Sequence, residues 1–204
     1  MNTTGKDING KRGFTPLQIA TGFTLIEIVI VLGVIAALAA ILVPTLMNYV
    51  EDAKKTRASK DVGIIAAAIA QLNKDTGKWP IYTDISSKTG LIDCLYTGPA
   101  SSILKTDDFV GTNPPQSFGT SFDHLMRNNA NYPSTGTNMW RGPYLSKDTT
   151  DSWGTPYAIL VKRFNGTTGV YAWVLSAGPD GIFQTDETSI EIPAGSDDIG
   201  ILIQ

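Results

Sequence analysis

Residues 22–47 read GFTLIEIVIVLGVIAALAAILVPTLM, and this stretch is the most informative feature of the chain. Its last 20 residues, 28–47, carry no charge. As a helix they would span about 30 Å, which is the thickness of the hydrocarbon core of a bilayer. Glu27 directly precedes this apolar run. A carboxylate in hydrocarbon is costly unless an opposite charge pairs with it. Glu27 therefore indicates that its carboxylate later pairs with a positive charge. The alternative is a carboxylate that snorkels to the membrane interface and has no role.

The residues before the apolar run are basic. Lys6, Lys11 and Arg12 stand against Asp7, so residues 1–22 carry +2, while the whole chain carries −3 and the remainder therefore −5. This asymmetry predicts a cytoplasmic N-terminus and an exported C-terminal part. An ordinary cleavable signal would have a shorter apolar region that ends in a small-x-small site. The alanines at 36–40 imitate such a site, but the apolar run continues through Val43.

An amphipathic segment follows the apolar run. Its apolar residues are spaced by four, three, four and three positions, which is typical of one helix face. They are Ala58, Val62, Ile65, Ile69 and Leu72. Asn73, Gly77 and Pro80 predict the end of the helix. We therefore expect one helix over residues 23–75, about 80 Å long. Pro44 would remove one helical hydrogen bond and loosen the preceding turn, and two helices broken there are the alternative.

The rest of the chain predicts a small sheet. Residues 157–161, 170–175 and 199–203 have the composition of strands, and Asn165-Gly166 favours a hairpin between the first two. Residues 91–96 predict a short second helix after Ser86-Ser87. Residues 97–137 are rich in Gly, Pro, Ser, Asn and Thr and predict a long loop. Together these elements indicate an α+β fold, in which a long N-terminal helix packs on a C-terminal antiparallel sheet.

Composition argues against several classes of function. Cys94 is the only cysteine, so no disulfide can form within the chain. His124 is the only histidine, and we interpret it as an exposed or hydrogen-bonded loop residue rather than a metal ligand. The chain shows no Ser/His/Asp arrangement, CxxC pair or glycine-rich phosphate loop, so we expect no enzymatic activity. A net charge of −3 gives no reason to expect nucleic acid as a partner.

The segment that begins at Gly22 resembles the processing site of type IV prepilins and pseudopilins. The resemblance implies that a prepilin peptidase cleaves after Gly22 and that the new amino group of Phe23 is N-methylated. It also implies that Glu27 pairs with the amino group of Phe23 in an adjacent subunit. Residues 1–22 would then be a cleaved leader, 23–50 a transmembrane and assembly helix, and 51–204 a periplasmic or extracellular head. The expected location is the bacterial inner membrane before assembly into a filament.

Four motifs in the C-terminal half narrow the resemblance. They are WRGPYL at 140–145, DSWGTPY at 151–157, LSAGPDG at 175–181 and SDDI at 196–199. Their order is similar to that of the major pseudopilin of the type II secretion system, and the resemblance covers residues 22–80 and 138–200. It implies a structural subunit that polymerises to drive protein export. The implied partners are further copies of the chain, minor pseudopilins, the prepilin peptidase and an inner-membrane assembly platform.

The resemblance also implies that the last loop binds calcium. Carboxylate and carbonyl oxygens are the ligands that Ca²⁺ prefers, in a shell of about 6–8. The candidate ligands are Asp180, Asp197, Asp198, Asp186 and the main-chain carbonyl of Leu175. Such an extracellular site is expected to be weak, with Kd of order 10⁻⁴–10⁻³ M. A solvated acidic turn is the alternative interpretation.

Two other functions fit the same sequence. The first is a type IV pilin of a surface filament for adhesion, motility or DNA uptake. Many such pilins close their last loop with a disulfide, so the single cysteine favours the pseudopilin. The second is a membrane-anchored binding module that does not polymerise, with residues 97–137 as its recognition surface.

Overall fold

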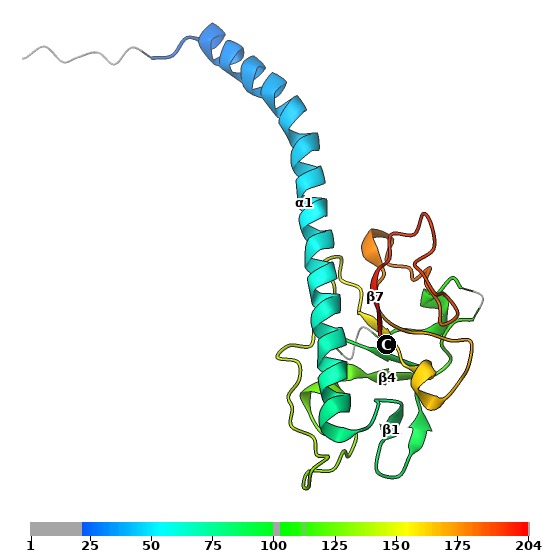
Figure 1. Ribbon diagram of the computed structural model, residues 1–204. Coiled ribbons are helices and arrows are strands. Elements are labelled where there is room, and N and C mark those ends of the chain that lie inside the picture. Colours follow the sequence, from blue (N-terminus) through cyan, green and yellow to red (C-terminus); the bar gives the residue numbers. More distant parts are fainter. Residues whose placement is uncertain (1–21, 100–102, 112, 204) are drawn as a thin grey trace, which may run out of the picture. The chain divides into compact units, whose positions relative to one another are not determined.

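The computed structural model describes residues 22–99, 103–111 and 113–203 (Figure 1). The chain divides into two compact units, Met1–Leu46 and Met47–Gln204, which are described separately below. The helix α1, Leu25–Thr76, contributes to both. Its bounds confirm the single long helix expected from the sequence, which continues through Pro44. At its end the N–H of Gly77 donates to the carbonyl of Asn73.

In the first unit, α1 shows its apolar side chains to solvent. Every large hydrophobic residue from Leu25 to Met47 is at least 46% exposed in the single chain. Among the described residues, α1 is the one helix long and apolar enough to cross a membrane. A helix that is apolar on all sides needs an apolar environment, either lipid or other helices.

The second unit contains a five-stranded sheet with the order β4-β3-β5-β6-β7. Its strands are β3 (Cys94–Tyr96), β4 (Phe118–Thr120), β5 (Ala158–Leu160), β6 (Ala172–Ser176) and β7 (Ile199–Ile203). The three predicted C-terminal strands are confirmed as β5, β6 and β7. All neighbours pair antiparallel except β3 and β4, which run parallel. The sheet is therefore mixed at the β4 edge, which the sequence did not indicate.

The predicted short helix at 91–96 is wrong. A hairpin of β1 (Tyr82–Asp84) and β2 (Thr89–Leu91) precedes β3 there. The Asp84 carboxylate accepts hydrogen bonds from the N–H groups of Ser86 and Ser87, which turns the chain. Lys88 and Gly90 both have positive φ, a conformation that interrupts a helix. The hairpin predicted around Asn165-Gly166 is confirmed, because β5 and β6 pair antiparallel, and its connection contains a short helical turn, Lys162–Asn165, that ends at Gly166.

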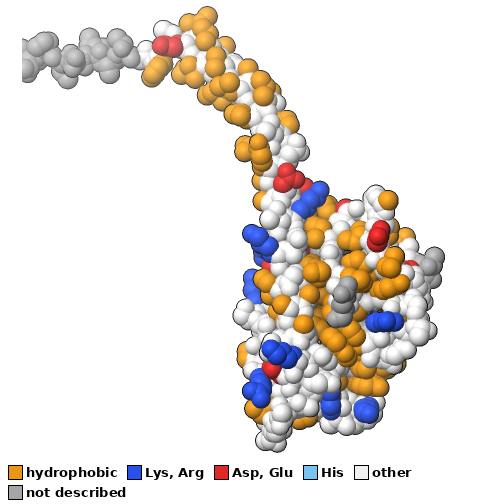
Figure 2. Space-filling model, viewed as in Figure 1, with side chains coloured by type: hydrophobic (Ala, Val, Ile, Leu, Met, Phe, Trp, Pro, Cys, Tyr) orange, Lys and Arg blue, Asp and Glu red, His pale blue; other side chains and the backbone are white. Residues whose placement is uncertain are grey.

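Two apolar clusters cover the two faces of the sheet. Alternation along β5 sends Ile159 toward α1, while Ala158 and Leu160 point to the opposite face. The helix face predicted from spacing is fully confirmed, because all five of its residues are at most 4% exposed. The opposite face packs Phe109, Phe183 and their neighbours. Figure 2 shows the charged side chains of this part of α1 on the outer surface.

The long segment 97–137 contributes to the core rather than forming a free loop. It contains η1 (Thr106–Asp108), β4 and a π-helical turn, η2 (Phe122–Met126). Leu125, Phe109 and Tyr132 from this segment are at most 5% exposed. His124 is also buried, and its Nδ1 lies 2.9 Å from the Tyr132 hydroxyl. The expectation of a hydrogen-bonded histidine is therefore confirmed, and the exposed alternative is wrong.

Candidate functional site

The first candidate site is the N-terminal end of α1. Thr24 caps the helix, because its Oγ1 accepts the N–H of Glu27 at 3.3 Å and its carbonyl accepts the N–H of Ile28. Phe23 is 78% exposed. The Glu27 carboxylate has no ion-pair partner in the described part of the chain. Sequence reasoning missed the role of Thr24, although a Thr three residues before a Glu is a recognised capping signal.

The proposed leader lies almost entirely outside the described residues, which begin at Gly22. Gly22 itself is exposed, and no atom lies within 4 Å of the position that a Cβ would take. Nothing within the described chain therefore blocks access to the peptide bond between Gly22 and Phe23.

The second candidate site is the loop after β6. It begins with a helical turn, η4 (Gly178–Asp180). Three groups form hydrogen bonds with its last residue, Asp180. Asp180 Oδ1 accepts the N–H of Ile182 at 2.8 Å, and its Oδ2 accepts Nε2 of Gln184 at 2.6 Å. Asp197 Oδ2 accepts the N–H of Asp180 at 3.1 Å. The structure thus brings Asp180 and Asp197 together across 17 residues of chain, with the Gln184 amide beside them.

Asp198, the next residue after Asp197, is only 7% exposed. Its Oδ2 accepts the N–H groups of Gln184 and Thr185 at 2.9 and 2.7 Å. Its Oδ1 is buried and has no hydrogen-bond partner within the described ranges. Burial raises the pKa of Asp198, and the hydrogen bonds from Thr185 and Gln184 oppose this rise. A buried carboxylate oxygen without a donor favours a proton or a cation.

Asp186 lies in a different hydrogen-bond network. Its Oδ1 accepts bonds from Thr188 and Ser189, and its Oδ2 accepts the N–H of Asn113. Burial acts to raise the pKa of Asp186, but these hydrogen bonds together hold it below its ordinary value. Leu175 is fully buried in β6, opposite Gly200 of β7.

No three carboxylate, imidazole or thiolate side chains within residues 22–99, 103–111 and 113–203 lie close enough together to hold a metal. A cation in this loop would therefore need main-chain or amide oxygens as well as carboxylates. Gln184 is the residue that sequence reasoning missed. Its amide links Asp180 to Ser196, whose hydroxyl donates to Gln184 Oε1 at 3.0 Å.

Gly178 has a geometric role in this loop. Its φ of +68° is unfavourable for other residues, and a Cβ there would clash with the main-chain carbonyl of Asp197. Ser176, two residues earlier, donates to Asp151 Oδ2 at 2.6 Å. Asp151 Oδ1 in turn accepts the N–H groups of Trp153 and Thr155. The two C-terminal motifs at 151–157 and 175–181 are thus joined by one carboxylate.

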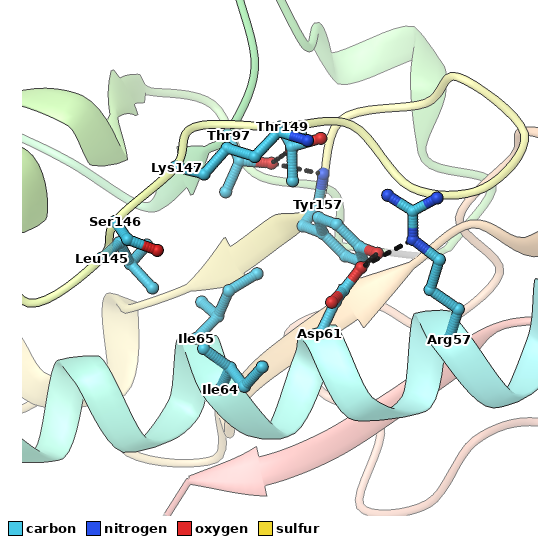
Figure 3. A pocket seen from close by; sticks show the side chains of 10 residues that line it. All are labelled: Arg57, Asp61, Ile64, Ile65, Thr97, Leu145, Ser146, Lys147, Thr149 and Tyr157. Atoms are coloured by element: carbon cyan, nitrogen blue, oxygen red, sulfur yellow. Dashed lines mark hydrogen bonds and ion pairs between the residues drawn. The ribbon is translucent and has the colours of Figure 1, made fainter.

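The 151–157 motif also fixes the sheet to α1. The buried Tyr157 donates its hydroxyl to Asp61 Oδ2 at 3.0 Å, and Arg57 approaches the same oxygen at 3.6 Å (Figure 3). Trp153 Nε1 donates to Glu51 at 2.9 Å. Beside Tyr157 lies a cavity of about 210 Å³ between α1 and residues 145–149. Tyr157 is fully buried, whereas Trp153 is only partly buried.

Comparisons with known proteins agree with these motifs. The family described as Type II secretion system (T2SS), protein G matches residues 115–194. The Type II secretion system core protein G of Pectobacterium carotovorum is 27% identical over 196 residues, which is 96% of this chain and 90% of that protein. The core protein G of Escherichia coli K12 is 31% identical over 166 residues, 81% of this chain and 86% of that protein.

A fimbrial protein is similar over a much shorter stretch. Fimbrial protein EcpC of Eikenella corrodens is 38% identical over 63 residues, which is 31% of this chain and 41% of that protein. No solved structure matches the chain significantly. The similarity to core protein G extends through both the apolar helix and the C-terminal motifs, and the chain therefore belongs to the family of type II secretion system core protein G, the major pseudopilins.

Proposed function

We propose that this chain is a structural subunit of a type II secretion pseudopilus, which polymerises through α1 to drive protein export. One observation carries the proposal. The first unit exposes every large apolar side chain from Leu25 to Met47, and it places Glu27 at the N-terminal end of that surface with no ion-pair partner in the described chain. The names of the similar core G proteins support the same role.

The physics of the membrane explains why Glu27 matters for assembly. Lipid tails are as apolar as leucine, so moving a helix from bilayer to filament brings no hydrophobic gain. A carboxylate in the bilayer centre costs about 2.5–3.5 kcal/mol on insertion scales. Pairing Glu27 with the amino group of Phe23 in an adjacent subunit would offset that cost in the filament alone. N-methylation of that amine keeps its positive charge.

The same proposal includes processing and topology. A prepilin peptidase would cleave after Gly22, and an inner-membrane assembly platform with minor pseudopilins would receive the product. The basic residues before Gly22 favour a cytoplasmic N-terminus, which leaves Met47–Gln204 on the periplasmic side. The proposed role of the chain is structural rather than catalytic. Subunits would lie in the membrane before they enter the filament.

The test is filament formation by the full chain, expressed together with the type II secretion genes. Sheared filaments are counted by electron microscopy, and membrane insertion is measured by fractionation. Glu27→Val should insert normally, since it removes an intramembrane charge, but should yield few filaments. The matched control is Asp52→Val, which removes an exposed carboxylate of the same helix beyond the apolar run. Normal filaments from Glu27→Val would contradict the pairing.

A surface pilin is less well supported. The fimbrial relative aligns with only 63 residues, and the only cysteine, Cys94, is buried, so no disulfide closes the last loop. A non-polymerising binding module is also disfavoured, because segment 97–137 contributes Phe109, Leu125 and Tyr132 to the core.

We further propose that the loop after β6 binds Ca²⁺. The observation that supports a cation there is the buried Asp198 Oδ1, which has no hydrogen-bond partner among the described residues, and the Asp197 carboxylate, which accepts the N–H of Asp180, lies in the same loop. These three carboxylates and the Leu175 carbonyl would hold the ion, which would neutralise their charge. Asp186 would have to give up its hydrogen bonds to Thr188 and Ser189 before it joined them.

A further inference from the structure

A short protrusion stands out from the loop after η4. Ile190 is 61% exposed, and Glu191 beside it is exposed as well. The residues on either side are fixed: the Ser189 carbonyl accepts Trp173 Nε1 at 2.8 Å, and Ile192 packs against the apolar cluster of Phe183. The fold therefore presents an isoleucine and a carboxylate together on a supported tip, an arrangement that the calcium proposal does not use.

A pocket of matching character lies beside the β1–β2 hairpin. Its volume is about 330 Å³, and apolar and aromatic side chains line it together with two lysines. The lining residues are Lys78, Trp79, Ile81, Tyr82, Ile85 and Lys88. Figure 1 shows the hairpin and the loop that follows η4 at opposite ends of the Met47–Gln204 unit. The pocket and the protrusion of one molecule are therefore too far apart to meet.

Contacts within the subunit hold two of the pocket residues, Trp79 and Lys78, in place. The Trp79 ring stacks on Phe164 at 3.8 Å with an interplanar angle of 3°, and Thr76 Oγ1 holds the backbone of Lys78. Lys88 has a φ of +55°, although glycine or asparagine is favoured at such a position. A strained lysine at the rim of a pocket is a reason to look for a function of its side chain.

We propose that the Ile190–Glu191 tip of one subunit docks into the Lys78–Lys88 pocket of a second copy in the filament. Ile190 would cover the apolar floor, and Glu191 would lie between the two ammonium groups. Because the two surfaces lie at opposite ends of the unit, the contact is head-to-tail, and each subunit of a filament can therefore give one surface and receive the other. The ion pairs set orientation, while burial of Ile190 provides most of the affinity. This contact rests on the proposed pseudopilus function.

Cysteine crosslinking of the full chain tests the contact. Filaments of the double variant Lys88→Cys/Glu191→Cys are sheared from cells, oxidised and separated without reductant. The expected result is a ladder of covalent multimers, because each subunit gives one cysteine and receives another. Each single variant should remain monomeric, since the native Cys94 is fully buried. A contact with two-fold symmetry would instead give dimers only from the double variant, without a ladder.

Charge reversal gives an independent measurement. Glu191→Lys should remove most filaments, and Lys78→Glu/Lys88→Glu should do the same. Combining the three substitutions should restore filament yield. Lys105→Glu, which reverses an exposed lysine outside both surfaces, is the matched control and should leave the yield unchanged.

The outcomes separate the contact from the function. Normal filaments of the double-cysteine variant without a ladder would overturn the contact and leave the pseudopilus proposal intact. A crosslink to a different protein, identified by mass spectrometry, would overturn the choice of a second copy. If the unmodified chain forms no filament with its secretion genes, the pseudopilus proposal fails and the contact fails with it.

Discussion

Glu27 and Glu187 are two carboxylates with different surroundings: Glu27 is exposed at the start of the apolar part of α1, and Glu187 is buried in the second unit. The Glu187 side chain is fully buried and pairs with Lys162 Nζ at 2.8 Å inside the same unit. Glu27 has no such partner in the part of the chain that the structure describes. The Glu187 charge is satisfied within the subunit, whereas we propose that Glu27 finds its opposite charge in an adjacent subunit.

Processing is the first prediction at the scale of single residues. Gly22→Val should leave an uncleaved, membrane-bound precursor. Glycine has no Cβ, so its backbone can enter a peptidase unobstructed, whereas the β-branched valine side chain adds bulk next to the bond to be cleaved. Intact mass spectrometry of the product measures the cleavage site directly. A wild-type mature protein that does not begin at Phe23 would show the assignment to be mistaken. Gly63→Val, at a half-buried glycine of α1 where no atom lies within 4 Å of an added Cβ, controls for a general effect of the substitution.

His124 predicts how acid affects the head. Burial lowers the pKa of His124 from 6.5 to about 4 in the folded chain. The unfolded chain therefore takes up a proton first, and the stability contributed by the neutral ring is complete above pH 6.5 and lost as pH falls toward 4. The difference corresponds to at most about 3 kcal/mol.

The measurement is the melting temperature of the Met47–Gln204 unit at about pH 7 and at about pH 4.5. His124→Gln should lose less stability on acidification than the wild type, whatever its stability at neutral pH. Carboxylates titrate equally in both proteins, so they cancel in the comparison. An equal loss in the two proteins would show that His124 is not the acid-sensitive group.

At the scale of elements, periodicity predicted more than composition did. The helix face of Ala58 through Leu72 followed from spacing alone, because a 3.6-residue repeat leaves few alternatives. The strands at 157–161, 170–175 and 199–203 followed from β-branched and aromatic runs. Residues 91–96 were mispredicted, because a short apolar run fits a buried strand or a helix equally well. Only the positive φ values at Lys88 and Gly90 decide between them.

The candidate loop was predictable only in part. Asp180, Asp197 and Asp198 could be named from the motifs, but their contacts depend on residues far along the chain. The Asp151 carboxylate that joins two motifs, the Gln184 amide and the Lys162–Glu187 pair all link positions between 4 and 25 residues apart. No periodic pattern encodes such pairs, so they require the fold itself.

The Lys162–Glu187 pair gives the prediction at this scale. Glu187 Oε1 has no hydrogen-bond partner in the described chain, and burial raises the pKa of Glu187 against the effect of Lys162. Lys162→Met would leave a buried carboxylate unpaired, which costs about 3–5 kcal/mol. For a unit of this size the melting temperature should fall by roughly 10 °C.

The control for this prediction is Arg163→Met, which removes the neighbouring exposed cation and should change the melting temperature little. The double variant Lys162→Met/Glu187→Leu should recover most of the loss, since both charges are then absent. A double variant as unstable as Lys162→Met would indicate a packing defect instead of an unpaired charge.

At the scale of the whole molecule, the two units carry different features. The Met1–Leu46 unit carries the apolar surface and Glu27, and the Met47–Gln204 unit carries the core, the acidic loop and the pocket at the hairpin. Stability of the second unit rests on two apolar clusters and on carboxylates held in its last loop. The second unit can therefore be tested for cation binding without the membrane helix.

Calcium should raise the melting temperature of the Met47–Gln204 unit. Asp180, Asp197 and Asp198 repel one another, and Asp198 Oδ1 lacks a donor, until a divalent cation supplies the missing charge. Binding to the folded state alone adds about 2.7 kcal/mol at a hundredfold excess over Kd. That corresponds to a rise of roughly 5–10 °C. Magnesium should substitute poorly, because it requires a tighter octahedral shell.

Asp180→Ala should remove most of the rise in melting temperature, while Asp107→Ala, at an exposed carboxylate of η1, should retain it. Identical melting curves in calcium and in chelator would make the loop a solvated acidic turn, held by Gln184 and Ser196 without an ion.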